Sequence, residues 1–370
     1  MERKEILIIS RSFYPQNSPR SFRTTELAKE LSAQGNNVTV LTFKRTEHSA
    51  FEAKHKVNIK DLGDPGETDL SGLKSKKLNT LNRVVKRFKE QFLLFPEIQL
   101  KDIVYKALKK EKGERYDLLI SIGAPHPVHW GVAKALEENR NLAGCWVADC
   151  GDPFMLASNM QFKRPFYFQY FEKNFCKRAD FITIPTEKAK EGYYPEFHDK
   201  IRVIPQGFRF EDVKLSEKAK SDGVVKFGYA GSLVPKRRDP TELLQFLEEE
   251  NIEYKFILYS KNKAIANELV QKFGSRIDYR GEADRIELLY HLSEVNFVLN
   301  FENVGTTQSP SKLIDYAIIK KPILSVTSGN LNKTAVNEFL KGDFNSAYRI
   351  ENPDQYRIEN IARRFLALAE

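Results

Sequence analysis

Short apolar runs alternate along the first half of the chain with amphipathic stretches. The strand-like runs cover residues 5–10, 37–42, 117–122, 144–148, 181–184 and 202–204. Uninterrupted runs of this length are typical of strands that are buried on both faces. Between them apolar residues recur every three or four positions, as Leu27, Ala28 and Leu31 do, which predicts helices that cover a sheet. The order predicts a parallel sheet built from βαβ units.

The alternation begins again after residue 222. Further strand-like runs cover 225–229, 254–259, 276–279, 295–300 and 321–326, and helical patterns cover 239–250, 264–273, 284–293 and 354–369. Between 208 and 222 charged residues replace the apolar period, so we expect the link between two domains there. The predicted fold is α/β, with two Rossmann-like doubly wound domains facing a central cleft. The predicted parts are an N-terminal domain at 1–207, a linker at 208–222, a C-terminal domain at 223–352, and a helix at 353–370 that packs back toward the N-terminal domain.

Composition restricts the classes of protein and partner. A length of 370 residues suits two domains, and a net charge of +9 favours phosphorylated ligands, nucleic acid or an anionic membrane. No apolar run is long enough to cross a bilayer, and Met1 to Lys4 lead directly into a strand, so we expect a cytoplasmic protein. The cysteines, Cys145, Cys150 and Cys176, lack the spacing of metal ligands, which favours reduced, buried thiols.

The segment Ser309-Pro310-Ser311-Lys312 follows a strand-like run and opens a helix. In an open α/β sheet, backbone N–H groups and the positive end of a helix can hold a phosphate at such a place. Asp315 lies one turn into the helix, where it could contact a sugar hydroxyl if the anion is a nucleotide diphosphate.

A second candidate site follows the run at 225–229, where Gly231 and Ser232 precede a basic loop. Gly231 permits close approach of the backbone to a ligand, and Lys236 or Arg237 could neutralise a diphosphate leaving group. A solvated basic loop without a ligand is the alternative. The position at the carboxyl end of a strand favours the site.

Two loops in the first half carry candidate acid–base groups. Asp149 and Asp152 follow the run at 144–148 and could bind sugar hydroxyls or accept a proton, although Asp152 could equally cap a helix. His126 and His129 follow the run at 117–122, where a base or a hydrogen-bond donor could face an acceptor substrate. His129 is the stronger candidate of the two. For either histidine, a structural role is about as well supported as a catalytic one.

Residues 73–92 combine lysines and arginines with apolar residues at helical spacing. A basic amphipathic helix of this kind can bind an anionic membrane surface. An ordinary surface helix with its apolar face in the core is the alternative. Nucleic acid is the weakest partner, because no recognised binding motif accompanies the charge.

Some chemistries are disfavoured by what the loops contain. The first strand is followed by Ser10-Arg11-Ser12 and not by a glycine-rich fingerprint, and no Walker lysine motif occurs. This argues against NAD-dependent oxidoreductases and P-loop ATPases. Asp149 and Asp152 also differ in spacing from the Asp-x-Asp pair by which many nucleotide-sugar enzymes of another fold hold a metal, so we expect no metal and no cofactor.

Several short motifs occur in a recognisable order. They are Phe13-Tyr14-Pro15, Arg23-Thr24-Thr25-Glu26, Trp146-Val147-Ala148-Asp149, Asp152-Pro153-Phe154, Ile204-Pro205-Gln206-Gly207, Tyr229-Ala230-Gly231-Ser232 and Pro310-Ser311-Lys312-Leu313-Ile314-Asp315. Together they resemble the GT-B glycosyltransferases, and specifically the retaining family 4 enzymes of bacterial surface-polysaccharide pathways.

The resemblance implies transfer of a sugar, with retention and without a metal, from a UDP-sugar or GDP-sugar to a saccharide or lipid-linked acceptor at the inner membrane face. Implied donor-binding residues in the C-terminal domain are Gly231, Ser232, Lys236, Arg237, Gly281, Ser309, Pro310, Ser311, Lys312 and Asp315. Implied acceptor-binding residues are Ser18, Arg20, His126 and His129. The candidate catalytic residues are His129, Asp149, Asp152 and Lys236.

Several positions depart from the family pattern, and Ser18 and Pro19 replace a glycine pair that the family often has in its first loop. Thr307 stands where the family often has the first of two glutamates, and Ser232 stands where it often has an arginine. They keep two alternatives open, namely a non-catalytic homologue that binds nucleotide sugars or saccharides, and a nucleotide-sugar epimerase or hydrolase on the same fold.

Overall fold

The computed structural model describes residues 3–66, 80–111, 113–156, 163–216, 223–302 and 312–370. The chain forms two compact units. The first unit contains Met1–Phe208 together with Ile358–Glu370, and the second contains Arg209–Arg357. The boundary after Phe208 falls at the start of the charged segment where the sequence predicts the link.

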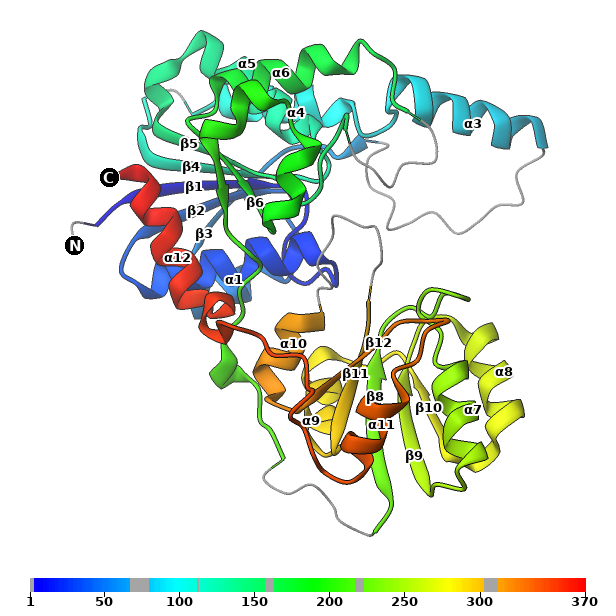
Figure 1. Cartoon of the computed structure of the whole chain (residues 1–370). Coiled ribbons are helices and arrows are strands. Elements are labelled where there is room, and N and C mark those ends of the chain that lie inside the picture. Colours follow the sequence, from blue (N-terminus) through cyan, green and yellow to red (C-terminus); the bar gives the residue numbers. More distant parts are fainter. Residues whose placement is uncertain (1–2, 67–79, 112, 157–162, 217–222, 303–311) are drawn as a thin grey trace. The chain divides into compact units, whose positions relative to one another are not determined.

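The first unit is built on a seven-stranded parallel sheet with the order β3-β2-β1-β4-β5-β6-β7 (Figure 1). The strands are β1 (Glu5–Ser10), β2 (Asn37–Thr42), β3 (Asn58–Asp61), β4 (Tyr116–Ile122), β5 (Ala143–Asp149), β6 (Phe181–Ile184) and β7 (Ile201–Val203). The first strand lies inside the sheet and the chain winds away from it in both directions. This order confirms a doubly wound, Rossmann-like fold for the unit.

Helices cover both faces of this sheet. They are α1 (Pro19–Ala33), α2 (His48–His55), α4 (Gln99–Leu108), α5 (Pro127–Glu138), α6 (Phe168–Arg178) and α12 (Ile358–Leu366). A further helix, α3 (Thr80–Leu93), extends away from the sheet. Successive residues of β1 point to opposite faces, so Ile6 and Ile8 pack with α1 and α12 while Leu7 and Ile9 pack on the side of α4, α5 and α6. The continuous apolar run of β1 reflects burial on both sides.

The second unit repeats the design with five parallel strands in the order β10-β9-β8-β11-β12. Its strands are β8 (Val225–Ala230), β9 (Tyr254–Tyr259), β10 (Ile277–Gly281), β11 (Phe297–Phe301) and β12 (Ile323–Val326), and its helices are α7 (Thr241–Glu249), α8 (Lys263–Phe273), α9 (Arg285–Ser293), α10 (Lys312–Ile319) and α11 (Lys333–Leu340). Phe227 and Phe256 stack in its core, where apolar residues of α7, α8 and α11 meet the sheet. Both units therefore have the predicted fold class.

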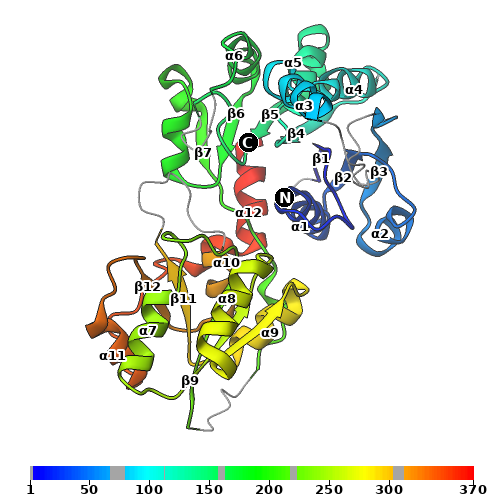
Figure 2. The same ribbon diagram turned by 90° about the vertical axis from the view of Figure 1, so that its right-hand side faces the viewer.

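Helix α12 lies beside α1 in both views of the first unit (Figures 1 and 2). Its Ile361 and Phe365 are fully buried in the core with α1, and Gly207 leaves room for Ile361, since a Cβ there would stand 2.6 Å from Ile361 Cγ1. The backbone N–H of Ile358 donates to the carbonyl oxygen of Phe208 at 3.0 Å. The two points where the chain passes between the units are thus adjacent on the first unit.

The structure differs from the predicted elements in a few places. Strand β3 and helix α11 were not predicted, and the last helix is shorter than the pattern at 354–369 because Arg357 is extended. Residues 153–156 are not helical, so the capping alternative for Asp152 is wrong. None of the described helices has the length and apolar character needed to cross a membrane.

Candidate functional site

The second sheet changes direction between β8 and β11, which are neighbours although α7, α8 and α9 separate them in sequence. In an open α/β sheet the loops at the carboxyl ends of such strands diverge and leave room for a ligand. The loop after β8 carries Gly231, Ser232, Lys236 and Arg237, and α10, after β11, begins at Lys312. The fold thus gathers most of the predicted donor-binding residues at one place.

Gly231 and Lys312 are in close contact. A Cβ at Gly231 would stand 2.3 Å from Lys312 Cε and 2.8 Å from its Nζ, and φ of Gly231 is +149°. The positive φ therefore favours glycine, and any larger residue would also push the end of the Lys312 side chain away from its place. The Lys312 ammonium donates to the hydroxyl of Tyr229, which is itself fully buried on β8.

Lys312 is a poorly hydrated cation. Burial and, to a smaller extent, repulsion by Arg238 lower its pKa to about 7, although Asp315 opposes the shift. A bound anion would favour the charged form of Lys312 and replace part of its lost hydration. The residue is suited to binding a phosphate group at the start of α10.

Asp315 lies one turn further along α10 and is engaged by Arg285 of α9. Arg285 Nε and Nη2 lie 3.0 Å and 2.5 Å from Asp315 Oδ1. Burial raises the pKa of Asp315 even though the arginine opposes the shift. The carboxylate remains 25% exposed, so contact with a ribose hydroxyl stays a prediction.

The basic loop after β8 projects into solvent. Ser232, Lys236 and Arg237 are exposed, and Lys236 adopts φ of +62° while its N–H donates to Asp239 Oδ2 at 3.3 Å. Gly281 ends β10 with φ of +69° and accepts a hydrogen bond from Ser260 N at 2.9 Å. The predicted residues Ser309, Pro310 and Ser311, and also Thr307, lie outside the described residues.

In the first unit the corresponding change of direction lies between β1 and β4. Ser18 caps α1, because its side chain accepts from Ser21 N at 3.2 Å. Arg20 is in the first turn of α1, and its Nη1 lies 3.4 Å from the carbonyl oxygen of Gly123 and 4.0 Å from Asp149 Oδ2. The predicted acceptor residues therefore gather around the ends of β1, β4 and β5.

Asp149 is buried in an ion pair with Arg23. Arg23 donates from Nε and Nη2 to the two carboxylate oxygens at 2.9 Å and 2.7 Å, and Thr183 Oγ1 adds a third bond at 2.7 Å. Burial raises the pKa of Asp149, but the charge and hydrogen bonds of Arg23, the charge of Arg20 and the hydrogen bond from Thr183 together hold the pKa below its ordinary value. Asp149 is a permanent carboxylate that joins α1 to the sheet.

His126 and His129 are both enclosed by protein. His126 Nε2 lies 3.0 Å from the carbonyl oxygen of Asp152, and burial lowers the pKa of His126 to about 4. His129 is fully buried, with Nδ1 2.8 Å from Ser121 Oγ, and burial lowers its pKa as well. The Asp152 side chain is exposed. A Cβ at Gly123 would stand 2.5 Å from His129 Nε2, so the glycine makes room for the imidazole ring.

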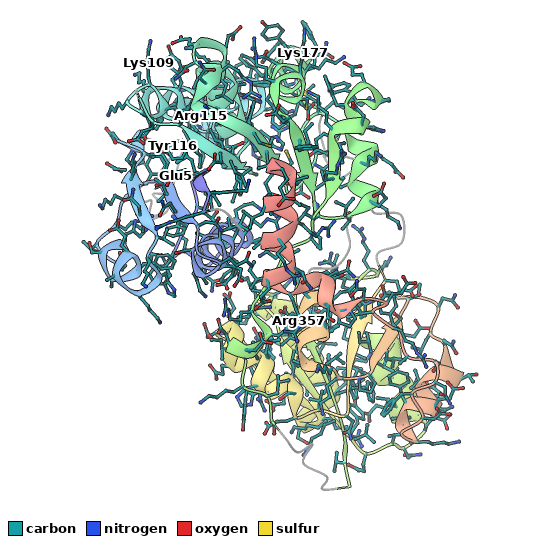
Figure 3. All side chains as sticks on the ribbon, turned by 90° about the vertical axis from the view of Figure 1, so that its left-hand side faces the viewer. Glu5, Lys109, Arg115, Tyr116, Lys177 and Arg357 are labelled. Carbon is teal, nitrogen blue, oxygen red and sulfur yellow. The ribbon has the colours of Figure 1, made fainter. Side chains whose placement is uncertain are left out.

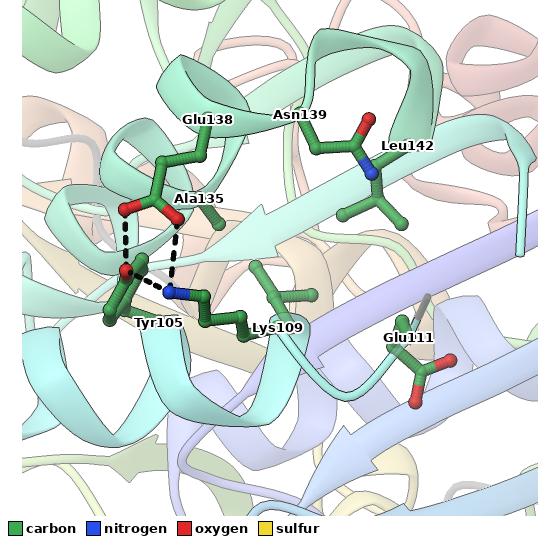
Figure 4. A pocket seen from close by; sticks show the side chains of 8 residues that line it. Tyr105, Lys109, Glu111, Ala135, Glu138, Asn139 and Leu142 are labelled. Carbon is green, nitrogen blue, oxygen red and sulfur yellow. Dashed lines mark hydrogen bonds and ion pairs between the residues drawn. The ribbon is translucent and has the colours of Figure 1, made fainter. Parts of the chain in front are cut away.

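A smaller and a larger hollow of the first unit bear on where a ligand could bind. The smaller is at the predicted acceptor region and is lined by Arg20, Arg23, Asp149, Cys150, Pro185, Ile204 and Gln206. The larger, of about 190 Å³, lies between α4 and α5 (Figure 4). There Tyr105, Lys109 and Glu138 bond to one another, as the dashed lines show.

The larger hollow is far from the predicted chemistry. It lies where α5 ends, near the edge at which the strands begin, and Figure 3 marks that edge by Glu5 and Tyr116. In parallel α/β sheets ligands bind at the opposite edge. We therefore take the smaller hollow as the acceptor-side candidate.

Helix α3 exposes its apolar side chains. Val85, Phe88, Phe92 and Leu93 are 46%, 55%, 45% and 52% exposed. Phe88 and Phe92 stack at 4.7 Å, and Figure 1 shows α3 extending away from the rest of the first unit. The alternative of an apolar face packed in the core is wrong for these residues. The part of the basic pattern before Thr80 lies outside the described residues.

Sequence reasoning missed the partners that set the chemistry of the predicted residues. Arg23 was part of a motif but was not assigned to Asp149, 126 positions away. Arg285 and Tyr229 were likewise not assigned to Asp315 and Lys312. The signal for Arg23 was its place among the apolar positions of α1, where an arginine must find a carboxylate.

Comparison with known proteins identifies the fold. No protein-family model matches the sequence, and no curated protein matches it. Among solved structures, a glycosyltransferase from Rickettsia africae aligns over 100% of this chain and 98% of its own, with a TM-score of 0.62 and 12% identity. HepE of Anabaena in complex with UDP and glucose aligns over 99% and 97%, with a TM-score of 0.54 and 13% identity.

A third similar structure has a different activity. A putative UDP-N-acetylglucosamine 2-epimerase from Listeria monocytogenes aligns over 99% of this chain and 96% of its own, with a TM-score of 0.51 and 12% identity. Similarity at this level of identity establishes a fold of two Rossmann-like units, the GT-B type.

Proposed function

We propose that the protein is a retaining glycosyltransferase of the family 4 type. It would move a sugar from a nucleotide-sugar donor, bound by the second unit, to a saccharide or lipid-linked saccharide bound by the first. The observation that carries the proposal is the group of cations where β8 and β11 diverge, with Lys312 on α10 and Lys236 and Arg237 on the exposed loop. The UDP and glucose in the HepE structure support a UDP-sugar as the first donor to test, followed by a GDP-sugar.

These cations would replace a metal at the diphosphate. When the bond between sugar and diphosphate breaks, negative charge develops on the leaving group, and fixed cations stabilise that charge more than the ground state. Lys236 is the proposed catalytic cation, while Gly231, Ser232, Gly281 and the segment from Ser309 to Ser311 would complete the donor site.

The first unit would supply the acceptor site. Arg20 and the exposed Asp152 are the proposed contacts to saccharide hydroxyls, because both stand at the edge where β1, β4 and β5 end. Ser18 caps α1, His126 and His129 are enclosed, and Asp149 is paired with Arg23, so the direct contact of these four residues with a substrate stays a prediction.

We place the proposed acceptor at an anionic bilayer because of α3. Its exposed apolar residues are flanked by Lys86, Arg87 and Lys89, which are exposed as well. Phe166 and Tyr170, 78% and 71% exposed, continue the apolar surface, and Tyr167 joins them to α3 by donating to the Phe92 carbonyl oxygen. Aromatic side chains together with cations are typical of helices that lie on anionic lipid.

The test is titration of the purified chain with UDP and GDP, with and without EDTA, followed by an assay of donor consumption. We expect binding of one nucleotide that EDTA leaves unchanged. Replacing Lys236 by Met should lower kcat/KM about a hundredfold, as expected for one lost charge at the leaving group. Lys341→Met, which removes an exposed lysine directly after α11, is the matched control. Absence of nucleotide binding would favour a non-catalytic saccharide-binding protein.

A nucleotide-sugar epimerase or hydrolase is the second candidate, favoured by the similarity to the Listeria protein. Incubation with the bound nucleotide sugar in the absence of acceptor separates the two. An epimerase or hydrolase converts the donor alone, whereas the proposed transferase consumes it at a useful rate only when acceptor is added.

A further inference from the structure

The loops after β4 and β5 bring together two histidines and a cysteine that the proposed function leaves without a direct role. His126, His129 and Cys150 each offer one ligand atom, and these three atoms lie within 4.8 Å of one another. All three residues are buried, at 5%, 0% and 1% exposure. His126 and His129 are three positions apart at the start of α5, and Cys150 comes from the end of β5.

The second ring nitrogen of each histidine already has a partner. His126 Nε2 faces the carbonyl oxygen of Asp152, so Nε2 carries the proton and the lone pair is on Nδ1. His129 Nδ1 faces Ser121 Oγ, which also accepts from Trp146 Nε1. A carbonyl or hydroxyl behind the ring is the outer support that metal-binding histidines usually have.

Each histidine keeps one ring nitrogen that could act as a metal ligand. His126 Nδ1 is buried and has no hydrogen-bond partner among the described residues. His129 Nε2 lies 3.5 Å from Cys150 Sγ. The hydroxyl of Tyr193, also buried and without a well-directed bond, lies beside the same thiol. A buried acceptor such as Nδ1 needs a donor or a cation, and none of the described residues donates a hydrogen bond to it.

We propose that His126 Nδ1, His129 Nε2 and Cys150 Sγ bind a zinc ion. In a tetrahedral zinc site the usual bond lengths put a thiolate sulfur and an imidazole nitrogen about 3.6 Å apart, close to the 3.5 Å between Cys150 and His129. One thiolate with two imidazoles is a soft ligand set of the kind that zinc occupies. The thiol gives its proton to solvent on binding, and water takes the fourth position.

The proposed site would be structural. The three ligands are enclosed, so zinc would join the loop after β4 to the end of β5 and would not touch a substrate. The positive charge of the Arg20 guanidinium opposes binding of a cation in this region. The Asp149 carboxylate, 4.0 Å from that guanidinium, offsets its charge. The site lies in the first unit, apart from the proposed donor cations, so it does not depend on the proposed function.

The test is the metal content of the full chain, purified without chelator and dialysed against zinc-free buffer. We expect about one zinc ion per wild-type chain, removed by EDTA. The zinc content should fall at least tenfold in Cys150→Ser and in His126→Phe, where the new ring keeps the packing against Phe154. Cys176→Ser, which removes another buried thiol of the same unit, should keep the zinc.

Cobalt gives a readout that does not depend on any variant. Wild-type chain stripped with EDTA and loaded with Co²⁺ should show the absorption of thiolate-bound tetrahedral cobalt, and Cys150→Ser should lose it. A folded wild-type chain without zinc and without this absorption would overturn the proposal, as would full zinc retention in Cys150→Ser. UDP titration of the same preparations shows separately whether the proposed function holds.

Discussion

At the scale of single residues, the charge of Lys312 should control anion binding by the second unit. Burial lowers the pKa of Lys312 to about 7, so the free lysine is charged below that pH and neutral above it. A diphosphate prefers the charged form. Affinity for UDP should therefore fall as pH rises above 7, by up to about tenfold per pH unit, with uptake of a proton on binding.

Calorimetry of UDP binding between about pH 7 and 9, in buffers of different ionisation heat, measures both effects. This range lies above the pH at which the terminal phosphate of UDP titrates, about 6. Lys312→Met should bind UDP weakly and without the pH dependence, while Lys341→Met should behave as wild type. Unchanged affinity across the range would mean that Lys312 does not meet the anion.

The ion pair of Arg23 and Asp149 is a residue-scale feature of stability. Both side chains are almost fully buried, so Arg23→Met leaves a carboxylate without its partner and should lower the free energy of unfolding by about 3–5 kcal/mol. Urea denaturation of the first unit measures the loss. Lys86→Met breaks an exposed pair with Glu90 and should cost less than about 1 kcal/mol. Equal losses in the two variants would refute the prediction.

At the scale of elements, α3 should decide membrane binding. Phe88→Ser with Phe92→Ser should abolish sedimentation with phosphatidylglycerol vesicles, because the apolar face no longer enters the lipid. Replacing Lys86, Arg87 and Lys89 by Gln should weaken binding by about 1 kcal/mol per residue, and added salt should mimic that loss. Ile286→Ser on α9 removes an exposed apolar side chain elsewhere and should change nothing. Equal binding to uncharged phosphatidylcholine would contradict the electrostatic part.

Helix α12 should be essential to the first unit although it is distant in sequence. Phe365→Ala should lower the stability of that unit by about 3–5 kcal/mol, since the ring is fully buried against α1 and Arg23. Thermal unfolding followed by tryptophan fluorescence reports on this unit, because both tryptophans, Trp130 and Trp146, are in it. Arg363→Ala, on the exposed side of α12, should be near neutral.

At the scale of the whole molecule, most strands were predictable because strands buried on both faces have continuous apolar sequences. Strand β3, Asn58-Ile59-Lys60-Asp61, has a single apolar residue and lies at the edge of its sheet, so the same reasoning missed it. Helix α11 has apolar residues at helical spacing, Ala335, Val336, Phe339 and Leu340, but it is only eight residues long and gives the period little more than two turns in which to recur.

The site was predictable only as a set of loops. Gly231 and Lys312 were named because each lies at the carboxyl end of a strand, but their contact depends on β8 and β11 being neighbours, which the strand order decides. The cysteines were judged by their spacing along the chain. His126, His129 and Cys150 meet through neighbouring strands, and spacing along one segment does not reveal such a cluster.

The second unit is an insertion within the first, because the first unit contains residues on both sides of Arg209–Arg357. The hydrogen bond from Ile358 N to the Phe208 carbonyl oxygen holds the two ends of the insertion next to each other. On a ribosome, all of Arg209–Arg357 is made before Phe365 exists, so the first unit waits with part of its core open while the second already has every residue of its own. The second unit, although its synthesis begins later, can therefore finish folding before the first. Because the insertion leaves and returns at adjacent points, a short loop from Phe208 to Ile358 should be enough to close the first unit without it.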